Sequence, residues 1–225
     1  METTRQKISV KEIVTIGMFC ALSYAVMLLS KLIPVNVMGF LNFDLKDVII
    51  AICGFMFGPI QAIIVSVIVS LIEMITVSST GPIGLLMNVL STCAFVVPAA
   101  IIYKSRRKFS GAIIGLIVGI LSMTAIMILW NWLITPLYMG MPREVIVTYL
   151  IPVFLPFNLL KGGINAAITL LLYKPVTSAL RRARLIPERP EGNGGKKKLS
   201  ALVTIGAIVV LASLVLVVLV WQHII

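Results

Sequence analysis

The sequence predicts an all-α integral membrane protein with a bundle of six transmembrane helices and one extra transmembrane helix at the C-terminal end. Three observations lead to this prediction. Hydrophobic residues make up 60% of the 225 residues and charged residues only 12%, which leaves too little polar surface for a water-soluble domain. The apolar residues fall into seven runs. The basic residues, which give a formal net charge of +11, gather between alternate pairs of runs.

Each apolar run is predicted to form a helix, in chain order. A transmembrane helix needs about 20 apolar residues to cross about 30 Å of hydrocarbon. The runs cover residues 13–30, 48–57, 59–77, 85–103, 111–133, 154–173 and 201–221. The second run is short, and Gly58-Pro59 separates it tightly from the third. The first run is longer than a signal-peptide core, so we expect it to remain as a helix.

The basic residues predict the orientation of the bundle in the cell membrane. They cluster before the first run, in "KSRRK" after the fourth and again after the sixth, whereas the opposite loops hold only Lys31, Lys46 and Arg143. The positive-inside rule therefore places the N-terminus in the cytoplasm. In a soluble chain the net charge would suggest nucleic acid, but here this rule accounts for it and no nucleic-acid partner is expected.

Composition divides the chain into three parts. Residues 1–174 form the six-helix membrane domain, and residues 175–198 form a basic, Pro/Gly-rich cytoplasmic linker without apolar periodicity. Residues 199–225 contain the additional helix, whose internal polar groups are only Thr204 and Ser213. This composition favours contact with lipid or a partner helix over ligand binding. If the helix crosses, the C-terminus lies outside the cell.

The sixth run carries a charged residue among apolar neighbours. Lys161 lies within "FNLLKGGIN", three residues after Asn158 and four before Asn165. These spacings place the three side chains on one helix face. Two interpretations compete: the lysine snorkels to the outer interface, or the polar face lines a cavity. We favour the cavity, because a snorkelling lysine does not need two amides beside it.

Further polar positions lie towards the same outer side. Asn131 and Thr135, at the end of the fifth run, are four residues apart and share a face beside tryptophans typical of interfacial anchors. Asn88, in the fourth run, contacts either a ligand or a neighbouring helix through a hydrogen bond. With Lys161, these groups predict one outward-facing pocket that offers amides, hydroxyls and a single cation.

The first outer loop, "KLIPVNVMGFLNFDLKDV", combines apolar side chains with carboxylates. Phe40, Leu41 and Phe43 either dip into the lipid headgroups or cover a flat ligand, which suits an aromatic ring system. Asp44 and Asp47 are expected beside them, outside the hydrocarbon. The loop is therefore a candidate cover for the pocket.

Other features limit the chemistry. Glu73, near the outer end of the third run, is predicted to lie at the interface, with a pairing to Lys161 as the alternative. The only histidine is His223, and the sequence contains neither a Walker A motif nor a catalytic triad, so an enzyme, a metal site and a cofactor are not expected. The cysteines are interpreted as packing residues: they are Cys20, Cys53 and Cys93.

The first run carries Gly17, Ala21 and Ala25, which are small residues spaced four apart. Small residues at this spacing allow another helix to approach closely. The face they form is therefore a candidate contact for a protein partner within the membrane.

Four places in the chain resemble one known family over residues 11–174. They are the small-residue face of the first helix, "GFLNFDLKDV" in the first outer loop, "GPIGLLMN" leading into the fourth helix, and "NWLITPLY" with "PFNLLKG" in the fifth and sixth. These segments are similar to the riboflavin-specific substrate-binding (S) component of energy-coupling factor (ECF) transporters. The resemblance implies a vitamin-capturing subunit that docks on a transmembrane coupling subunit driven by two cytoplasmic ATPases.

The resemblance also implies roles for individual residues. Polar contacts to the flavin carry over to Asn131, Asn158 and Lys161, and lid contacts to Phe40, Leu41 and Phe43. The partner face maps onto Gly17, Ala21 and Ala25, with glycine where the family motif has alanine. The full candidate ligand set is Phe40, Leu41, Phe43, Asp44, Gly84, Asn88, Asn131, Thr135, Asn158, Lys161 and Asn165.

Alternative functions remain open from the sequence. The ligand is expected to be riboflavin or FMN, and an S component for another vitamin, such as folate or thiamine, is the first rival. A ligand with carboxylates would favour more cations than the single Lys161. The second rival is a membrane scaffold without transport function, in which the seventh helix is the working part.

Overall fold

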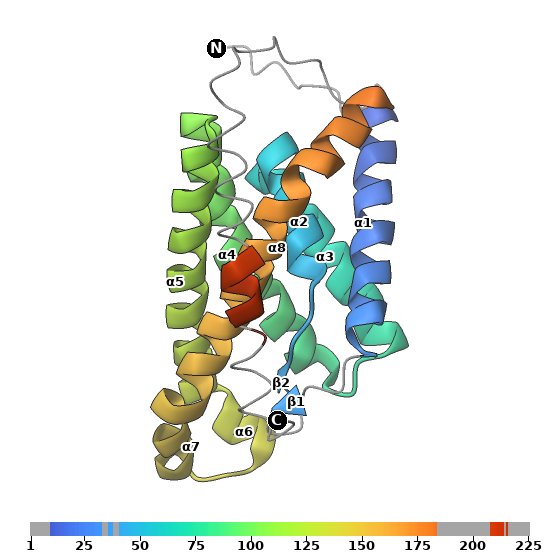
Figure 1. Ribbon diagram of the computed structural model, residues 1–225. Coiled ribbons are helices and arrows are strands. Elements are labelled where there is room, and N and C mark those ends of the chain that lie inside the picture. The colour runs from blue at the N-terminus through green and yellow to red at the C-terminus, as the bar shows by residue number, and fades with distance from the viewer. Residues whose placement is uncertain (1–9, 33–35, 38–40, 184–207, 214, 216–225) are drawn as a thin grey trace, which may run out of the picture.

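The structure is a computed structural model, and it describes residues 10–32, 36–37, 41–183, 208–213 and 215. Long helices run side by side through the bundle (Figure 1). The elements, in chain order, are α1 (Val10–Ser30), β1 (Asn36–Val37), β2 (Leu41–Asn42), α2 (Lys46–Phe57), α3 (Pro59–Thr76), α4 (Gly81–Arg106), α5 (Phe109–Leu133), α6 (Thr135–Met139), α7 (Arg143–Tyr149), the π-helix η1 (Leu150–Phe154) and α8 (Leu155–Arg182).

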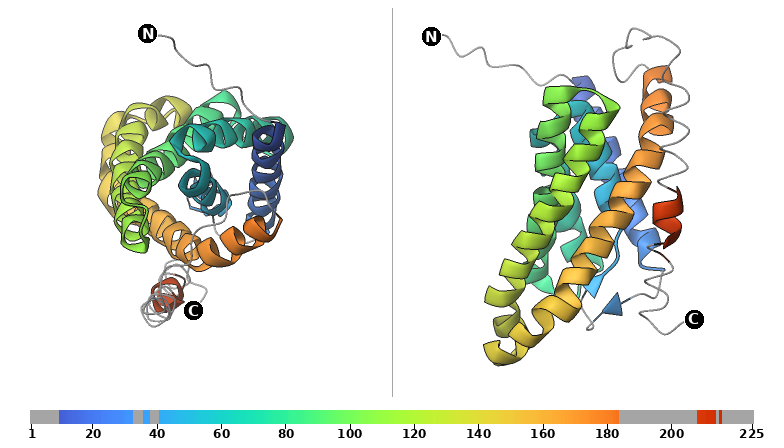
Figure 2. Two further views of the ribbon diagram at one scale, coloured as in Figure 1. Left: turned by 90° about the horizontal axis from the view of Figure 1, so that it is seen from above. Right: turned by 60° about the vertical axis from the view of Figure 1, so that its left-hand side comes forward.

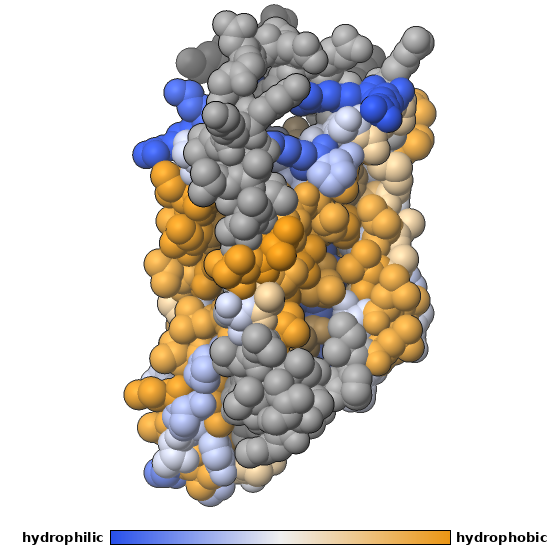
Figure 3. All heavy atoms as spheres, in the orientation of Figure 1, coloured by the Kyte–Doolittle hydropathy of each residue, from blue (hydrophilic) through white to orange (hydrophobic). Residues whose placement is uncertain are grey.

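Five of the described helical segments are long and apolar enough to cross a membrane. They are Glu12–Ser30, Pro59–Thr76, Gly81–Arg106, Phe109–Leu133 and Arg143–Arg182. Hydrophobic residues form a broad band across the face in Figure 3, and strongly hydrophilic residues gather at its upper end. The prediction of an all-α membrane protein is therefore confirmed. Most of the predicted seventh helix lies outside the described residues.

The remaining predicted span of the bundle is α2, which has only 12 residues. At 1.5 Å per residue it extends about 18 Å, less than a membrane thickness. Seen along the bundle axis, α2 lies inside a ring formed by α1, α3, α4, α5 and α8 (Figure 2). Its first ten residues are buried accordingly. A helix enclosed by protein on all sides does not need to match the hydrocarbon thickness.

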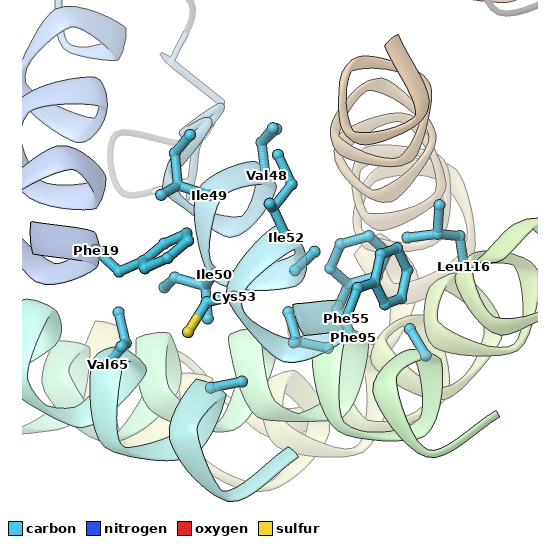
Figure 4. Packing of buried hydrophobic residues seen from close by; sticks show 14 of the residues in the cluster. Phe19, Val48, Ile49, Ile50, Ile52, Cys53, Phe55, Val65, Phe95 and Leu116 are labelled. Atoms are coloured by element: carbon cyan, nitrogen blue, oxygen red, sulfur yellow. The ribbon is translucent and has the colours of Figure 1, made fainter. Parts of the chain in front are cut away.

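The hydrophobic core surrounds α2. Ile50, Ile52 and Cys53 of α2 are fully buried, and side chains from the ring helices, among them Phe19 and Phe95, point towards them (Figure 4). This central position explains why the second run is apolar throughout instead of amphipathic: each face of the helix meets a neighbour.

Small residues bring α4 and α5 close together. A Cβ atom added to Gly115 of α5 would lie 2.7 Å from the backbone oxygen of Ala99 in α4, and one added to Gly119 would collide with the backbone oxygen of Phe95. Only glycine leaves room for this approach. These glycines therefore set the short distance between the two helices.

The segment between the predicted runs 111–133 and 154–173 is helical. It forms α6, α7 and η1, and the helix then continues as α8 through Arg182, nine residues beyond the predicted end at Tyr173. Pro152 and Pro156 lack a backbone N–H, so the chain takes one wider turn before the regular α-helix resumes. This arrangement places the start of α8 beside the first outer loop.

The two ends of the bundle differ in character. The last turns of α4 and α8 carry Lys104, Arg106, Arg181 and Arg182 at the upper end in Figure 1. At the opposite end, β1 and β2 form a short antiparallel hairpin in which Val37 pairs with Leu41. The basic clusters of the α4–α5 connection and of α8 thus share one end, as the charge pattern predicts.

Candidate functional site

A cavity of about 260 Å³ lies at the end of the bundle that carries the hairpin. This volume is close to the lower end of the range for small-molecule sites, about 300–1,000 Å³. Its wall comes from α1, the hairpin segment, α3, α4, α5 and α8. The lining residues are Ser30, Lys31, Leu41, Asn42, Phe43, Asp44, Glu73, Ser78, Ser79, Thr80, Met87, Asn88, Ser91, Met127, Phe157, Asn158 and Lys161.

Lys161 is buried in this wall and forms an ion pair. Its Nζ donates a hydrogen bond to Oδ2 of Asp44 over 3.1 Å, and its exposed fraction is 7%. The ammonium group therefore ends inside the protein, so the snorkelling interpretation is wrong. Burial alone would raise the pKa of Asp44, but the ammonium groups of Lys161 and Lys46 outweigh it and hold this pKa below its usual range.

The two asparagines on the same face of α8 support this pair differently. Nδ2 of Asn165 donates to the backbone oxygens of Asp44 (3.1 Å) and Lys161 (3.0 Å), so this residue fixes the loop from behind the wall. Asn158 lines the cavity, and its Nδ2 donates to the backbone oxygen of Phe154. Its side-chain oxygen and the second hydrogen on Nδ2 are the groups it can offer to a ligand.

Glu73 is buried inside the bundle, with an exposed fraction of 7%, and its predicted position at the membrane interface stays a prediction. Its Oε2 lies 2.5 Å from Nζ of Lys46 and accepts a hydrogen bond from Nδ2 of Asn88 over 3.1 Å. Its Oε1 lies 3.8 Å from Nζ of Lys31. The carboxylate thus pairs with these two lysines, whereas the suggested partner Lys161 pairs with Asp44. The central position of α2 brings Lys46 to α3.

Asp44 and Asp47 also lie inside the bundle, and their expected position outside the hydrocarbon stays a prediction. Both are buried, at 9% and 1% exposed, and Oδ1 of Asp47 accepts a hydrogen bond of 2.6 Å from Oγ1 of Thr92. The helix α2 begins two residues before the predicted start at Val48, and the ring encloses its first turn. The sequence did not predict this buried network. Equal numbers of lysines and carboxylates beside apolar runs could have indicated that these charges pair with one another.

Besides Asn165, three described candidate ligand residues lie away from the cavity wall. Asn131 is fully buried, donates to the backbone oxygen of Met127 and accepts a hydrogen bond from Oγ1 of Thr135 over 2.8 Å. The shared face predicted for Asn131 and Thr135 is therefore present. Thr135 and Gly84 line a separate cavity of about 10 Å³. None of the three lines the main cavity, whereas Met127, one turn before Asn131 in α5, does.

Side chains of the first outer loop cover one side of the cavity. Leu41 is buried in a cluster with Ile146, Phe154 and Phe157. The ring of Phe43 lies 4.8 Å from that of Phe157, centroid to centroid. Both loop residues thus pack on the η1–α8 segment and line the cavity. Phe40 lies outside the described residues.

The small residues of α1 lie on its exposed face, opposite the face that packs against the bundle. Gly17, Ala21 and Ala25 are exposed, whereas Phe19 and Ser23 face the bundle. A Cβ atom added to Gly17 would meet nothing within 4 Å. This face is therefore free, within the described residues, to receive another helix.

A membrane bundle with a charge-lined cavity of this size has the features of a binding protein for a small ligand. The family described as "ECF transporter, substrate-specific component" matches residues 11–173. The chain belongs to this family.

Two relatives and one solved structure illustrate the similarity. The chain is 29% identical over 179 residues to a Staphylococcus aureus protein named riboflavin transporter RibU, covering 76% of this chain and 93% of the relative. It is 27% identical over 188 residues to riboflavin transporter FmnP of Bacillus subtilis, covering 78% and 98%. A solved structure, described as the S component of a bacterial ECF transporter, has a TM-score of 0.64 at 29% identity and covers 76% of this chain and 97% of the other.

Proposed function

We propose that this chain is the riboflavin-binding S component of an ECF-type, ATP-driven vitamin importer. The observation that carries the proposal is the wall of the cavity, where aromatic and aliphatic side chains meet amides, hydroxyls and two lysines that are each paired with a carboxylate. The names of the two relatives described above, both riboflavin transporters, point to the same ligand.

The chemistry of riboflavin suits this wall. The flavin has a flat, neutral ring system with carbonyls and ring nitrogens, and its tail is a chain of hydroxyls. Phe43, Phe157 and Met87 offer apolar surface for the ring. Asn88, Asn158 and Lys161 offer groups for hydrogen bonds to the carbonyls and hydroxyls. A carboxylate-bearing ligand such as folate would instead require cations without carboxylate partners.

The orientation follows from the distribution of charge. The basic end of the bundle faces the cytoplasm, so the cavity opens towards the outside, where a vitamin is captured. In this proposal α1 to α5 and α8 correspond to the six-helix S-component domain of residues 1–174, and residues 199–225 add a seventh helix. The exposed Gly17, Ala21 and Ala25 contact the transmembrane coupling subunit, which two cytoplasmic ATPases drive.

Reconstituted transport tests the proposal. Proteoliposomes containing the full-length chain, a coupling subunit and its two ATPases should accumulate labelled riboflavin only when ATP is enclosed on the side of the ATPases. The matched control omits the coupling subunit and should show binding without accumulation. Accumulation of labelled folate or thiamine in place of riboflavin would contradict the proposed substrate, and riboflavin uptake without the coupling subunit would contradict the proposed mechanism.

A further inference from the structure

The charges that line the cavity are balanced. Two lysines, Lys31 and Lys161, and two carboxylates, Asp44 and Glu73, belong to the wall. Lys161 pairs with Asp44 at 3.1 Å and Lys31 with Glu73 at 3.8 Å. Each cation that a ligand meets in the described wall therefore already has an anionic partner.

Glu73 has a second role behind the wall. Its Oε2 contacts Nζ of Lys46, a residue that is 1% exposed and does not line the cavity. One carboxylate thus neutralises two lysines and also accepts a hydrogen bond from Asn88. Loss of its charge would leave two cations close to the ligand with less compensation.

Riboflavin and its phosphorylated form differ in charge. Riboflavin is uncharged, whereas the phosphate group of FMN carries a charge of about −1.5 to −2 at neutral pH. A phosphate that enters a buried cavity loses its hydration, and this cost is recovered only where cations and hydrogen-bond donors are free to pair with it. Here the cations are paired, and Asp44 and Glu73 repel the phosphate.

We propose that Glu73 is a specificity-determining residue that excludes phosphorylated flavins, so that the cavity admits riboflavin in preference to FMN. The proposal rests on the proposed function, because it assumes a flavin site. It assigns the discrimination to charge and not to the size of the cavity. A change of Glu73 to an isosteric neutral residue should therefore weaken the preference for riboflavin.

The experiment compares riboflavin and FMN affinities by flavin fluorescence titration of the purified full-length protein in detergent. Glu73→Gln should lower the ratio of riboflavin affinity to FMN affinity by roughly tenfold, because it removes one negative charge that repels the phosphate at close range. Lys31→Gln should widen the ratio by about threefold, since Lys31 is partly solvent-exposed and its charge is more screened. Glu144→Gln, an exposed α7 position outside the cavity wall, should leave the ratio unchanged.

The outcomes separate the two proposals. If the wild-type protein binds no riboflavin, the proposed function fails. If it binds riboflavin but shows no preference over FMN, or if Glu73→Gln keeps the wild-type ratio, only the assignment of Glu73 is overturned. If Glu73→Gln cannot be purified in a folded state, Lys31→Gln decides: a widened ratio supports charge discrimination, and an unchanged ratio overturns it.

Discussion

Nζ of Lys161 and Oδ2 of Asp44 lie 3.1 Å apart, although 117 positions separate the two residues in the chain. The pair joins the segment after β2 to α8, and both side chains are about one-tenth exposed, at 9% and 12%. It therefore has two functions that can be separated: it holds the first outer loop against the bundle, and it presents an ammonium group to the cavity.

Substitution of both partners separates these functions. Lys161→Met should lower stability by about 3–5 kcal/mol, because it removes the cation in direct contact with the buried carboxylate of Asp44. The double variant Lys161→Met/Asp44→Asn should recover much of this loss in a thermal unfolding assay. Riboflavin affinity should remain about tenfold to a hundredfold below wild type in the double variant, since the hydrogen bond from the ammonium group is still missing. Recovery of wild-type affinity would assign Lys161 a purely structural function.

Because α4 and α5 lie so close together, enlarging a glycine between them by one methyl group should lower the stability of the protein. Gly115→Ala places a methyl group 2.7 Å from the backbone oxygen of Ala99, so the helices must move apart. The expected destabilisation is about 1–3 kcal/mol, measured as a lower midpoint of thermal unfolding. Gly17→Ala is the matched control, because a Cβ there meets nothing within 4 Å. Equal effects of the two variants would contradict the packing described for α4 and α5.

The sequence predicted most of the helices because lipid imposes a simple rule on their length and composition. The spans predicted at 59–77 and 111–133 agree with α3 and α5 within two residues at each end. It did not predict that α2 lies inside the ring, because hydrophobicity does not distinguish a helix that contacts lipid from one that contacts other helices. The burial of Lys46 and Asp47 follows from that central position and was missed for the same reason.

The candidate site was predicted in part. The spacing of Asn158, Lys161 and Asn165 identified one face of α8 correctly, because helical periodicity is a local property. The ion partners of Lys161 and Glu73 were not predicted, because they depend on contacts between segments distant in the chain. Asn131 and Thr135 share a face as expected, but their hydrogen bonds are made within their own chain segment.

The exposed face of α1 should serve a partner and not the ligand. Ala21→Leu or Ala25→Leu should abolish riboflavin uptake in proteoliposomes that contain the coupling subunit and ATPases, because a bulky side chain prevents close approach of another helix. Riboflavin binding by the isolated variant should equal that of wild type, since neither alanine lines the cavity. A loss of binding in the isolated subunit would assign the face to the ligand site or to the fold.

The C-terminal segment should be dispensable for ligand binding. Among the residues that the structure describes, those lining the cavity lie between Ser30 and Lys161, so a chain that ends at Glu188 should bind riboflavin with wild-type affinity. Lys196 to Lys198 precede the last apolar run and should remain in the cytoplasm, which places a reporter fused after Ile225 outside. A reporter found in the cytoplasm would contradict the membrane crossing. A truncated protein that folds but does not bind riboflavin would show that the ligand site depends on the C-terminal segment.

Riboflavin binding by the purified full-length protein is the measurement that tests the central claim most directly. Quenching of flavin fluorescence on titration into the protein in detergent should saturate at one riboflavin per chain. An excess of folate or thiamine should not displace the flavin, because the lysines of the cavity wall are paired and the apolar surface suits a neutral ring system. Absence of saturable quenching, or displacement of riboflavin by either vitamin, would contradict the assignment of this cavity as a riboflavin site.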